Sequence, residues 1–205
     1  AMEGVMVSAF DKGHRKIVSV FTQPDGSYAI DGLRAVKHNL RARLMGQQDE
    51  WQDNVKAGSS DIRLRIKPAT GDDLQDQRPA SSGFSMLKFD NLRDKLNFKM
   101  MCSYCHQVGT VGFRTPEQPV DWETMVRRMD GFGGLYRHTQ KNIVKRLTNT
   151  YKDDAIRKWP RFVPAPAPTG LAARARITAW EMGKKLESSY HDLELGPDGL
   201  VYAVN

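Results

Sequence analysis

Two cysteines and one histidine carry the clearest chemical signal in this sequence. Cys102 and Cys105 are the only cysteines of the chain, and His106 follows directly, which gives the spacing C-x-x-C-H. Two thiols three positions apart on one helical turn can each bond a vinyl group of one porphyrin edge, and the adjacent histidine then lies under the iron. The pattern therefore predicts one covalently attached c-type haem, with His106 as its proximal ligand.

Two other kinds of site share part of this pattern. A C-x-x-C pair also forms redox disulfides and half of many zinc sites. A zinc site needs further soft ligands, and the chain has no third cysteine. A thioredoxin-like disulfide requires a preceding strand, whereas residues 91–98 have a polar or helical pattern. The haem remains the favoured interpretation.

Composition restricts the class of protein. The chain has 205 residues with 40% hydrophobic and 27% charged residues, which is typical of globular domains. No run approaches the roughly 18 apolar residues of a membrane span. Because covalent haem is attached outside the cytoplasm, the haem prediction implies an exported protein, periplasmic or extracellular, whose signal was removed or lay further upstream.

The net charge of +7 is concentrated around the C-x-x-C-H segment. Eleven Lys and Arg against six Asp and Glu lie between Leu96 and Pro160, an excess of five. Such a face steers an acidic redox partner toward the site, although a solvated basic face without a partner explains it equally well. Stacking aromatic residues do not alternate with the basic ones, which disfavours nucleic-acid binding.

The elements around this segment differ on its two sides. Short β-rich stretches separated by tight turns predict strands and an antiparallel sandwich at the N-terminal side. These stretches are residues 4–10, 16–21, 27–30, 39–45 and 62–66. His14 and His38 are expected to be surface histidines without a ligand role.

Residues 3–68 resemble the carboxypeptidase regulatory-like domain. The likeness rests on Gly-Val-Met-Val-Ser-Ala-Phe from Gly4 and on Thr-Gln-Pro-Asp-Gly-Ser-Tyr-Ala-Ile-Asp-Gly-Leu from Thr22. It implies a transthyretin-like or immunoglobulin-like sandwich. This family opens with a further strand, for which the sequence has no room before Gly4. The resemblance thus implies that the chain is part of a longer protein, or that another chain fills an open sheet edge.

Helices are predicted after the C-x-x-C-H segment. Asp121 is a plausible N-cap, and Trp122, Met125, Val126 and Met129 then lie on one helical face. A glycine-rich stretch from Asp130 ends that helix, and a second apolar stripe begins at Thr139 and ends at Tyr151. About 65 residues are too few for a large apolar core, which a porphyrin would complete.

This region resembles class I-type monohaem cytochrome c domains. Over residues 96–152, C-x-x-C-H is followed by an arginine-containing loop and by the phrase W-x-x-x-V-x-R-M, here from Trp122 to Met129. The resemblance makes Met129 the first choice as sixth iron ligand, with Met125 and His138 as alternatives. Packing in the core is the other explanation for either methionine.

Arg114 lies in the loop after the haem-binding motif. A guanidinium matches a carboxylate in a bidentate fashion, so Arg114 is a candidate donor to a haem propionate. A solvated loop arginine is the alternative.

The last residues predict a hairpin. Leu193 and Leu195 alternate, Gly-Pro-Asp-Gly turns the chain at residues 196–199, and the alternation returns from Leu200 to Val204. The phrase is similar to the repeat of streptogramin lyase-like β-propellers. One hairpin cannot form a propeller, so this likeness too implies a longer protein.

Together these patterns predict a multidomain α+β protein. Its parts are an N-terminal antiparallel β-sandwich (1–69), a linker (70–83), a small all-α cytochrome c domain (84–158), a Pro/Ala-rich linker (159–170) and the start of a propeller-like region with a C-terminal β-hairpin (171–205). The expected function is electron transfer through haem c.

No separate catalytic residues are evident in the sequence, so whether the protein is an enzyme stays open. One alternative is the haem-bearing portion of a larger propeller-containing oxidoreductase or lyase-like enzyme. Another is a structural, filament-forming cytochrome that self-assembles through the open edge of the sandwich.

Overall fold

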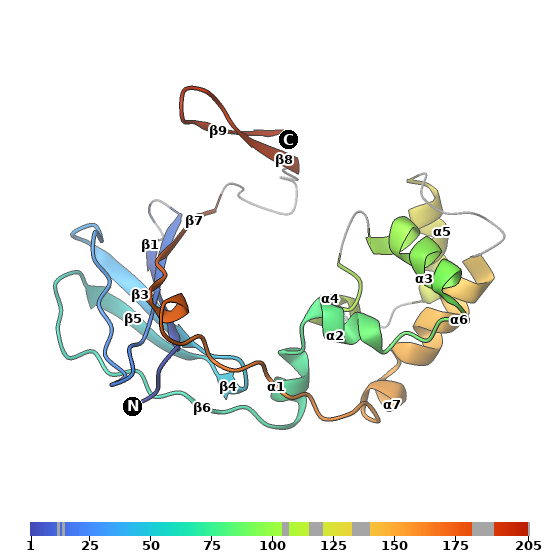
Figure 1. Ribbon diagram of the computed structural model, residues 1–205, viewed down its shortest axis with the longest axis horizontal. Coiled ribbons are helices and arrows are strands. Elements are labelled where there is room, and N and C mark those ends of the chain that lie inside the picture. The colour runs from blue at the N-terminus through green and yellow to red at the C-terminus, as the bar shows by residue number, and fades with distance from the viewer. Residues whose placement is uncertain are drawn as a thin grey trace. The chain divides into compact units, whose positions relative to one another are not determined.

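The chain forms two compact units of different secondary structure. The structure is a computed structural model that describes residues 1–11, 13, 15–103, 107–114, 121–132, 140–181 and 191–204. Residues 1–67 and 166–205 form the sheet unit, and residues 68–165 form the helical unit. Figure 1 shows the strands and helices of each unit. The protein is therefore mixed α+β.

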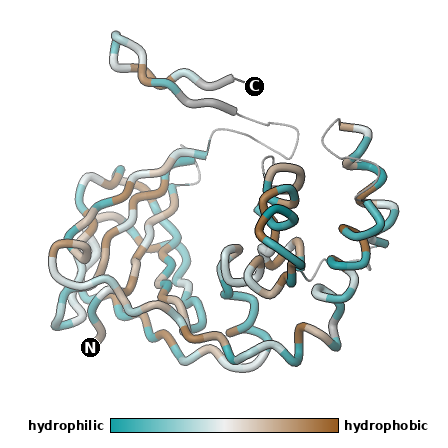
Figure 2. The backbone as a smooth tube through the Cα atoms, turned by 45° about the vertical axis from the view of Figure 1, so that its right-hand side comes forward, coloured by the Kyte–Doolittle hydropathy of each residue, from teal (hydrophilic) through white to brown (hydrophobic). Residues whose placement is uncertain are grey.

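A five-stranded antiparallel sheet dominates the sheet unit, with the strand order β5-β3-β1-β2-β7. Its strands are β1 (Met6–Asp11), β2 (Lys16–Phe21), β3 (Lys37–Arg43), β5 (Glu50–Lys56) and β7 (Ile177–Trp180). Apolar residues at alternate positions of the three central strands bury one face of the sheet, because successive side chains point to opposite faces. The buried set is Val7, Ala9, Val18, Leu40 and Ala42. Figure 2 shows hydrophobic and hydrophilic residues interspersed along these strands.

Two of the predicted strands were wrong, and two strands of the five-stranded sheet were not predicted. Residues 27–30 and 62–66 are extended but form no ladder. The sheet instead contains β5 and β7, whose pairing partners are not evident from local pattern. Polar residues dominate β5, which lies at one edge of the sheet and needs to bury little. β7 comes from the region predicted to be propeller-like, yet it pairs with β2 at the other edge.

His38 is also a correction, because it is buried rather than a surface residue. It shares the inward face of β3 with Leu40 and Ala42. The position of His14 lies outside the described residues.

Two shorter ladders complete the β-structure. β4 (Gln47–Gln48) pairs with β6 (Lys67–Pro68). β8 (His191–Leu195) pairs with β9 (Val201–Val204) in antiparallel fashion, which confirms the predicted hairpin. Its turn uses Gly199 at φ +76°, a conformation that glycine adopts without steric cost. The propeller itself stays a prediction.

The helical unit consists of short helices, of which two match the expected ones closely. α5 begins after Asp121, whose carboxylate accepts the Glu123 N–H, and it ends at Asp130 as predicted. α6 buries Ile143 and Leu147, as its apolar stripe indicates. The helices are α1 (Gly71–Asp76), α2 (Ala80–Ser85), α3 (Leu92–Phe98), the π-helical turn η1 (Lys99–Ser103), α4 (Val111–Arg114), α5 (Trp122–Asp130), α6 (Gln140–Thr150) and α7 (Asp153–Ile156).

The two expected linkers differ from each other. Residues 70–83 form α1 and part of α2, because Leu74 packs with Ala69 and Phe162 in a small buried cluster. Residues 160–169 are extended without regular secondary structure, as their proline content indicates. A short 3₁₀ turn, η3 (Ala172–Arg174), precedes β7. Among the described helices, none is long and apolar enough to cross a membrane.

Candidate functional site

Cys102 lies at the C-terminal end of a helix that is well defined by its own sequence. The Asn91 side chain accepts the Asp94 N–H at 2.9 Å and so caps the start of α3. Phe98, which ends α3, is 1% exposed and anchors the helix in the core. The chain then continues directly into η1, whose fourth residue is Cys102. A fixed helix therefore carries the first cysteine of the motif.

The π-helical form of η1 is unusual. Hydrogen bonds from residue i to i+5 are rare in proteins and occur mostly as single turns, frequently at functional sites. Here the widened turn contains Met100, Met101 and Cys102. The motif thus begins where the helical backbone departs from regular α geometry.

The Cys102 side chain is half-buried at the edge of an apolar cluster. Burial raises the pKa of the Cys102 thiol to about 11, because a thiolate is poorly solvated there. The thiol is accordingly protonated at neutral pH and is a weak nucleophile and a weak metal ligand.

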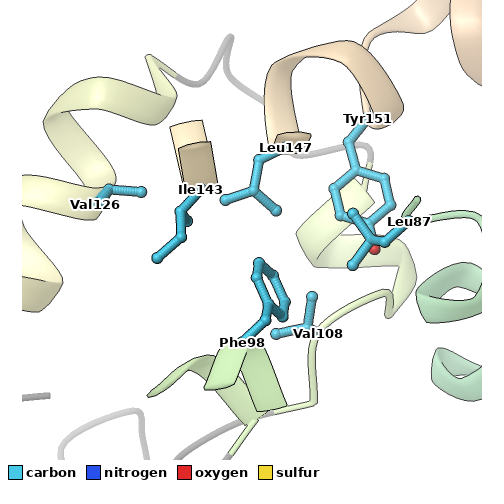
Figure 3. Close-up of a cluster of buried hydrophobic side chains, with 7 residues drawn as sticks. All are labelled: Leu87, Phe98, Val108, Val126, Ile143, Leu147 and Tyr151. Atoms are coloured by element: carbon cyan, nitrogen blue, oxygen red, sulfur yellow. The ribbon is translucent and has the colours of Figure 1, made fainter. Parts of the chain in front are cut away.

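The cluster beside Cys102 is the main apolar core of the helical unit. Figure 3 shows Phe98 of α3 pointing toward Ile143 and Leu147 of α6. The buried members are Leu87, Phe98, Val108, Val126, Ile143, Leu147 and Tyr151. Partly buried aromatic rings surround them, and several ring centroids lie 5.1–6.2 Å apart. The described residues thus build an apolar core of their own, which was not expected for so short a region.

Cys105 and His106 lie outside the described residues, as does His138. Their predicted roles as second thioether, proximal ligand and alternative sixth ligand stay predictions. Among the residues that the structure describes, no group of three or more His, Cys, Asp or Glu side chains could hold a metal ion.

The two candidate methionines differ in burial. Both are on α5, where Val126 is the buried residue that contacts the apolar cluster. Met129 is half-buried, whereas Met125 is 38% exposed. Met129 is therefore the better placed of the two for a contact in the interior. Trp122, at the start of the same helix, packs against the cluster.

Arg114 has a defined structural environment that differs from a solvated loop. It is 2% exposed, and its guanidinium donates to the main-chain carbonyls of Gln75, Asp76 and Arg78 at 3.2–3.4 Å. These carbonyls end α1 or follow it, where a helix leaves acceptors unpaired and favours a positive charge. Burial lowers the pKa of Arg114. The side chain therefore caps α1, and a propionate contact would have to compete with that role.

Arg78 is a second buried arginine, which the sequence pattern did not reveal. Its guanidinium donates to the Pro160 carbonyl at 2.6 Å and to the Ser82 hydroxyl at 2.8 Å. It also lies over the Trp159 and Phe162 rings at 5.4 and 5.3 Å. Trp159 and Phe162, beside the Pro-rich segment, were the available sequence signal for a buried arginine, because arginine commonly stacks on aromatic rings.

Gly109 shows why the loop after the motif packs so closely on α2. Its φ is +100°, and a Cβ there would lie 2.5 Å from the Phe84 nitrogen and 2.6 Å from the Ala80 carbonyl oxygen. Only glycine satisfies both conditions. The close approach brings the loop that starts near the motif against α2, and Val108 into the buried cluster.

A basic groove lies on another face of the helical unit. It has a volume of about 750 Å³ and is lined by Lys88, Lys145, Lys158 and Trp159, among others. Arg146 also lines it, but its guanidinium is paired with Asp94. Trp159 is half-buried and contacts Tyr151 of the core at a ring distance of 6.0 Å. Trp159 thus lies between the exposed lysines of the groove and the aromatic rings of the core.

Comparison with protein-family models, with curated proteins and with solved structures found no match for this chain.

Proposed function

We propose that the helical unit carries one covalent haem c and transfers single electrons. The C-x-x-C-H sequence from Cys102 to His106 carries this proposal. Support comes from Cys102, which lies in a π-helical turn beside an apolar core, the setting that an apolar macrocycle requires. The haem, when bound, supplies the one-electron chemistry.

The protein's own residues would hold the group in a defined way. Cys102 and Cys105 would hold the haem through thioethers, each formed by addition of S–H across a vinyl group, and His106 would ligate the iron. Met129 is the proposed sixth ligand because it is half-buried beside Val126 on α5. The aromatic residues of the cluster would exclude water, which tunes the potential of the iron. Arg114 remains a candidate propionate donor through its Nε, which has no hydrogen-bond partner among the described residues.

Covalent haem attachment implies maturation outside the cytoplasm, so the proposal includes export to the periplasm or beyond. It also includes an acidic redox partner. Lys88, Lys145 and Lys158 in the basic groove give the positive field that would steer such a partner, and Trp159 leads from the groove into the core.

An absorption spectrum tests the central proposal. Protein matured in an export-competent host should show a Soret band and a sharp reduced α-band, with haem retained on a denaturing gel. A Cys102→Ala, Cys105→Ala double variant should lose retained haem, whereas Ser103→Ala, within the same motif, should keep it. A weak band at the red end of the oxidised spectrum that disappears in Met129→Ala and persists in Met125→Ala would identify the sixth ligand. Absence of any Soret band would refute the haem.

A kinetic comparison tests the partner. Reduced protein should react with anionic ferricyanide at a rate that falls as ionic strength rises, because salt screens the attraction. Lys145→Glu with Lys158→Glu should slow this reaction. Arg93→Glu with Lys95→Glu, at two exposed positions on α3, changes the net charge by the same amount and serves as the control. Equal slowing by both changes would show that the rate depends on net charge alone, and would argue against the groove as the site of encounter.

A further inference from the structure

Two extended segments of the sheet unit line one cavity without joining the sheet. We call residues 27–33 the Tyr28 segment and residues 61–66 the Ile62 segment. The cavity has a volume of about 600 Å³, and residues from both segments form its wall. Its floor comes from the buried face of the sheet, through His38, Leu40 and Val55.

Both segments have the side-chain alternation of a strand. In the Ile62 segment, Ile62, Leu64 and Ile66 are half-buried, and each residue between them is exposed. In the Tyr28 segment, Tyr28 and Ile30 are half-buried, and the residues on either side are exposed. A period of two is typical of a strand that covers an apolar surface with one face.

The main chains of these segments have no ladder partner among the described residues. Within the described part of the chain, no backbone hydrogen bond joins the N–H groups of residues 28–33 or 61–66 to another main chain. The link between the segments is the Tyr28 hydroxyl, which donates to the Ile62 carbonyl at 3.1 Å. That contact is made by a side chain, and among the described residues no main-chain hydrogen bond joins the two segments.

The floor of the cavity contains a further unpaired polar atom. His38 is 2% exposed, and its Nε2 lies 3.0 Å from the Arg34 carbonyl, to which it donates. Its Nδ1 is then an acceptor, and it has no partner in the described part of the chain. The Nδ1 atom is shielded from solvent, so a group in the cavity cannot reach it without a movement of the ring.

We propose that this cavity binds an extended peptide segment, which adds as one strand between the Tyr28 and Ile62 segments. Such a strand would use the N–H groups of residues 28–33 and 61–66, which have no main-chain partner among the described residues, as in other cases of strand addition. A small apolar ligand of similar volume would leave those groups unpaired. This inference is independent of the proposed haem.

The inward and outward sides of the cavity between the two segments determine which side chains the peptide would carry. Its inward residues would be apolar, to lie over Leu40 and Val55. Beside Arg63 and Arg65, which are exposed, its outward residues would be acidic. Asp31 and Asp61 at the rim of the cavity disfavour further acidic residues next to them. Opposite charges on neighbouring strands are favourable.

Titration of the whole chain with synthetic peptides tests the proposal. The probe is an acetylated and amidated octapeptide of alternating Val and Glu. Two control peptides have Lys in place of Glu, or N-methylated Val that removes main-chain donors. The Val-Glu peptide should bind saturably, the Lys peptide roughly tenfold more weakly, and the N-methylated peptide not measurably. Equal binding of all three would overturn the proposal.

Amide hydrogen exchange with the same probe locates the binding. The Val-Glu peptide should protect amides in both segments, while those of β1 should already be protected in its absence. Protection of both segments without peptide would show that they pair with each other, and protection that increases with protein concentration alone would show that a second copy is the occupant. Either result overturns a separate peptide partner.

A charge-reversed protein gives a matched control. Arg63→Glu with Arg65→Glu should reverse the preference, so that the Lys peptide binds more tightly than the Glu peptide. Arg93→Glu, on α3 of the helical unit, should leave the preference unchanged. An unchanged preference in the first variant would contradict the proposed position of the acidic side chains.

Discussion

The two units close their apolar interiors in different ways. In the sheet unit the buried face consists of small aliphatic side chains such as Val7, Ala9 and Ala42, and a cavity of about 600 Å³ lies against Leu40. In the helical unit large aromatic rings pack at 5–6 Å around Phe98. Large rings from several short helices fill space that small residues on a flat sheet cannot. The first interior therefore leaves room for another segment, whereas the described rings of the second pack against one another, with Cys102 at the edge of the cluster.

The strongest test of this difference is Phe98→Ala. Loss of a ring that is fully enclosed by others should lower the free energy of unfolding by about 3–5 kcal/mol, because the surrounding rings cannot collapse fully. Urea unfolding followed by circular dichroism measures the change. Phe132→Ala, where the ring is 75% exposed, should change stability by no more than about 0.5 kcal/mol. Similar losses in both variants would show that the aromatic cluster does not hold the helical unit together.

In the sheet unit, Leu40→Ala should cost less. Leu40 is also buried but borders the cavity, so neighbouring side chains can move into the vacated space. We expect a loss of about 2 kcal/mol, near the lower end for leucine truncation. The same unfolding measurement applies, with Leu195→Ala as the exposed control. A loss as large as that of Phe98→Ala would mean that the sheet unit is as tightly closed as the helical one.

Arg114→Met tests whether a charged group is part of the closed interior. The change removes the donors to three carbonyls at the end of α1, and we expect it to cost about 1–3 kcal/mol. Arg127→Met breaks only an exposed pair with Glu123 and should cost about 0.5 kcal/mol or less. If Arg114→Met left stability intact but changed the midpoint potential of the haem-loaded protein, the propionate role would be favoured over the capping role.

The expected effect that is smallest at neutral pH concerns the Cys102 thiol in haem-free protein, because it arises only where the thiol ionises. An unfolded thiol ionises near its ordinary pKa of 9.0, whereas the folded thiol keeps its proton up to about pH 11. The folded state therefore binds more protons in this range, so the free energy of unfolding should fall as pH rises from about 9 to 11 and should not depend on this group below pH 9. Unfolding of a Cys105→Ser protein, compared with the same protein carrying Cys102→Ala, isolates this term. Identical pH profiles would place the thiol in solvent.

Local signals predicted the helical elements better than the sheet. Asp121 as N-cap and the stripe through Ile143 and Leu147 depend only on neighbours within a turn or two, so α5 and α6 were predicted correctly. The hairpin of β8 and β9 is local in the same sense. By contrast, strand pattern in residues 62–66 did not reveal that this segment lacks a partner, because a ladder depends on a second strand elsewhere.

The candidate site was predictable only in its residue types. The spacing of Cys102 and Cys105 is visible in sequence, but the raised thiol pKa and the π-helical turn follow from tertiary packing. Arg114 was chosen for its charge, and its actual partners come from α1, which was expected to be a linker. Carbonyl groups have no sequence signature, so a cap made by a distant side chain cannot be predicted from pattern.

The pairing of β7 with β2 affects the order in which the protein can fold during synthesis. Residues 68–165 separate the two strands in the chain, so the ribosome completes the helical unit before β7 exists. Until then the outer side of β2 is an open edge, which is the part of a sheet most prone to pair with other chains. The early helices are mostly local in their contacts and form quickly. Slow translation through residues 68–165 would thus lengthen the time during which a nascent chain is exposed to aggregation.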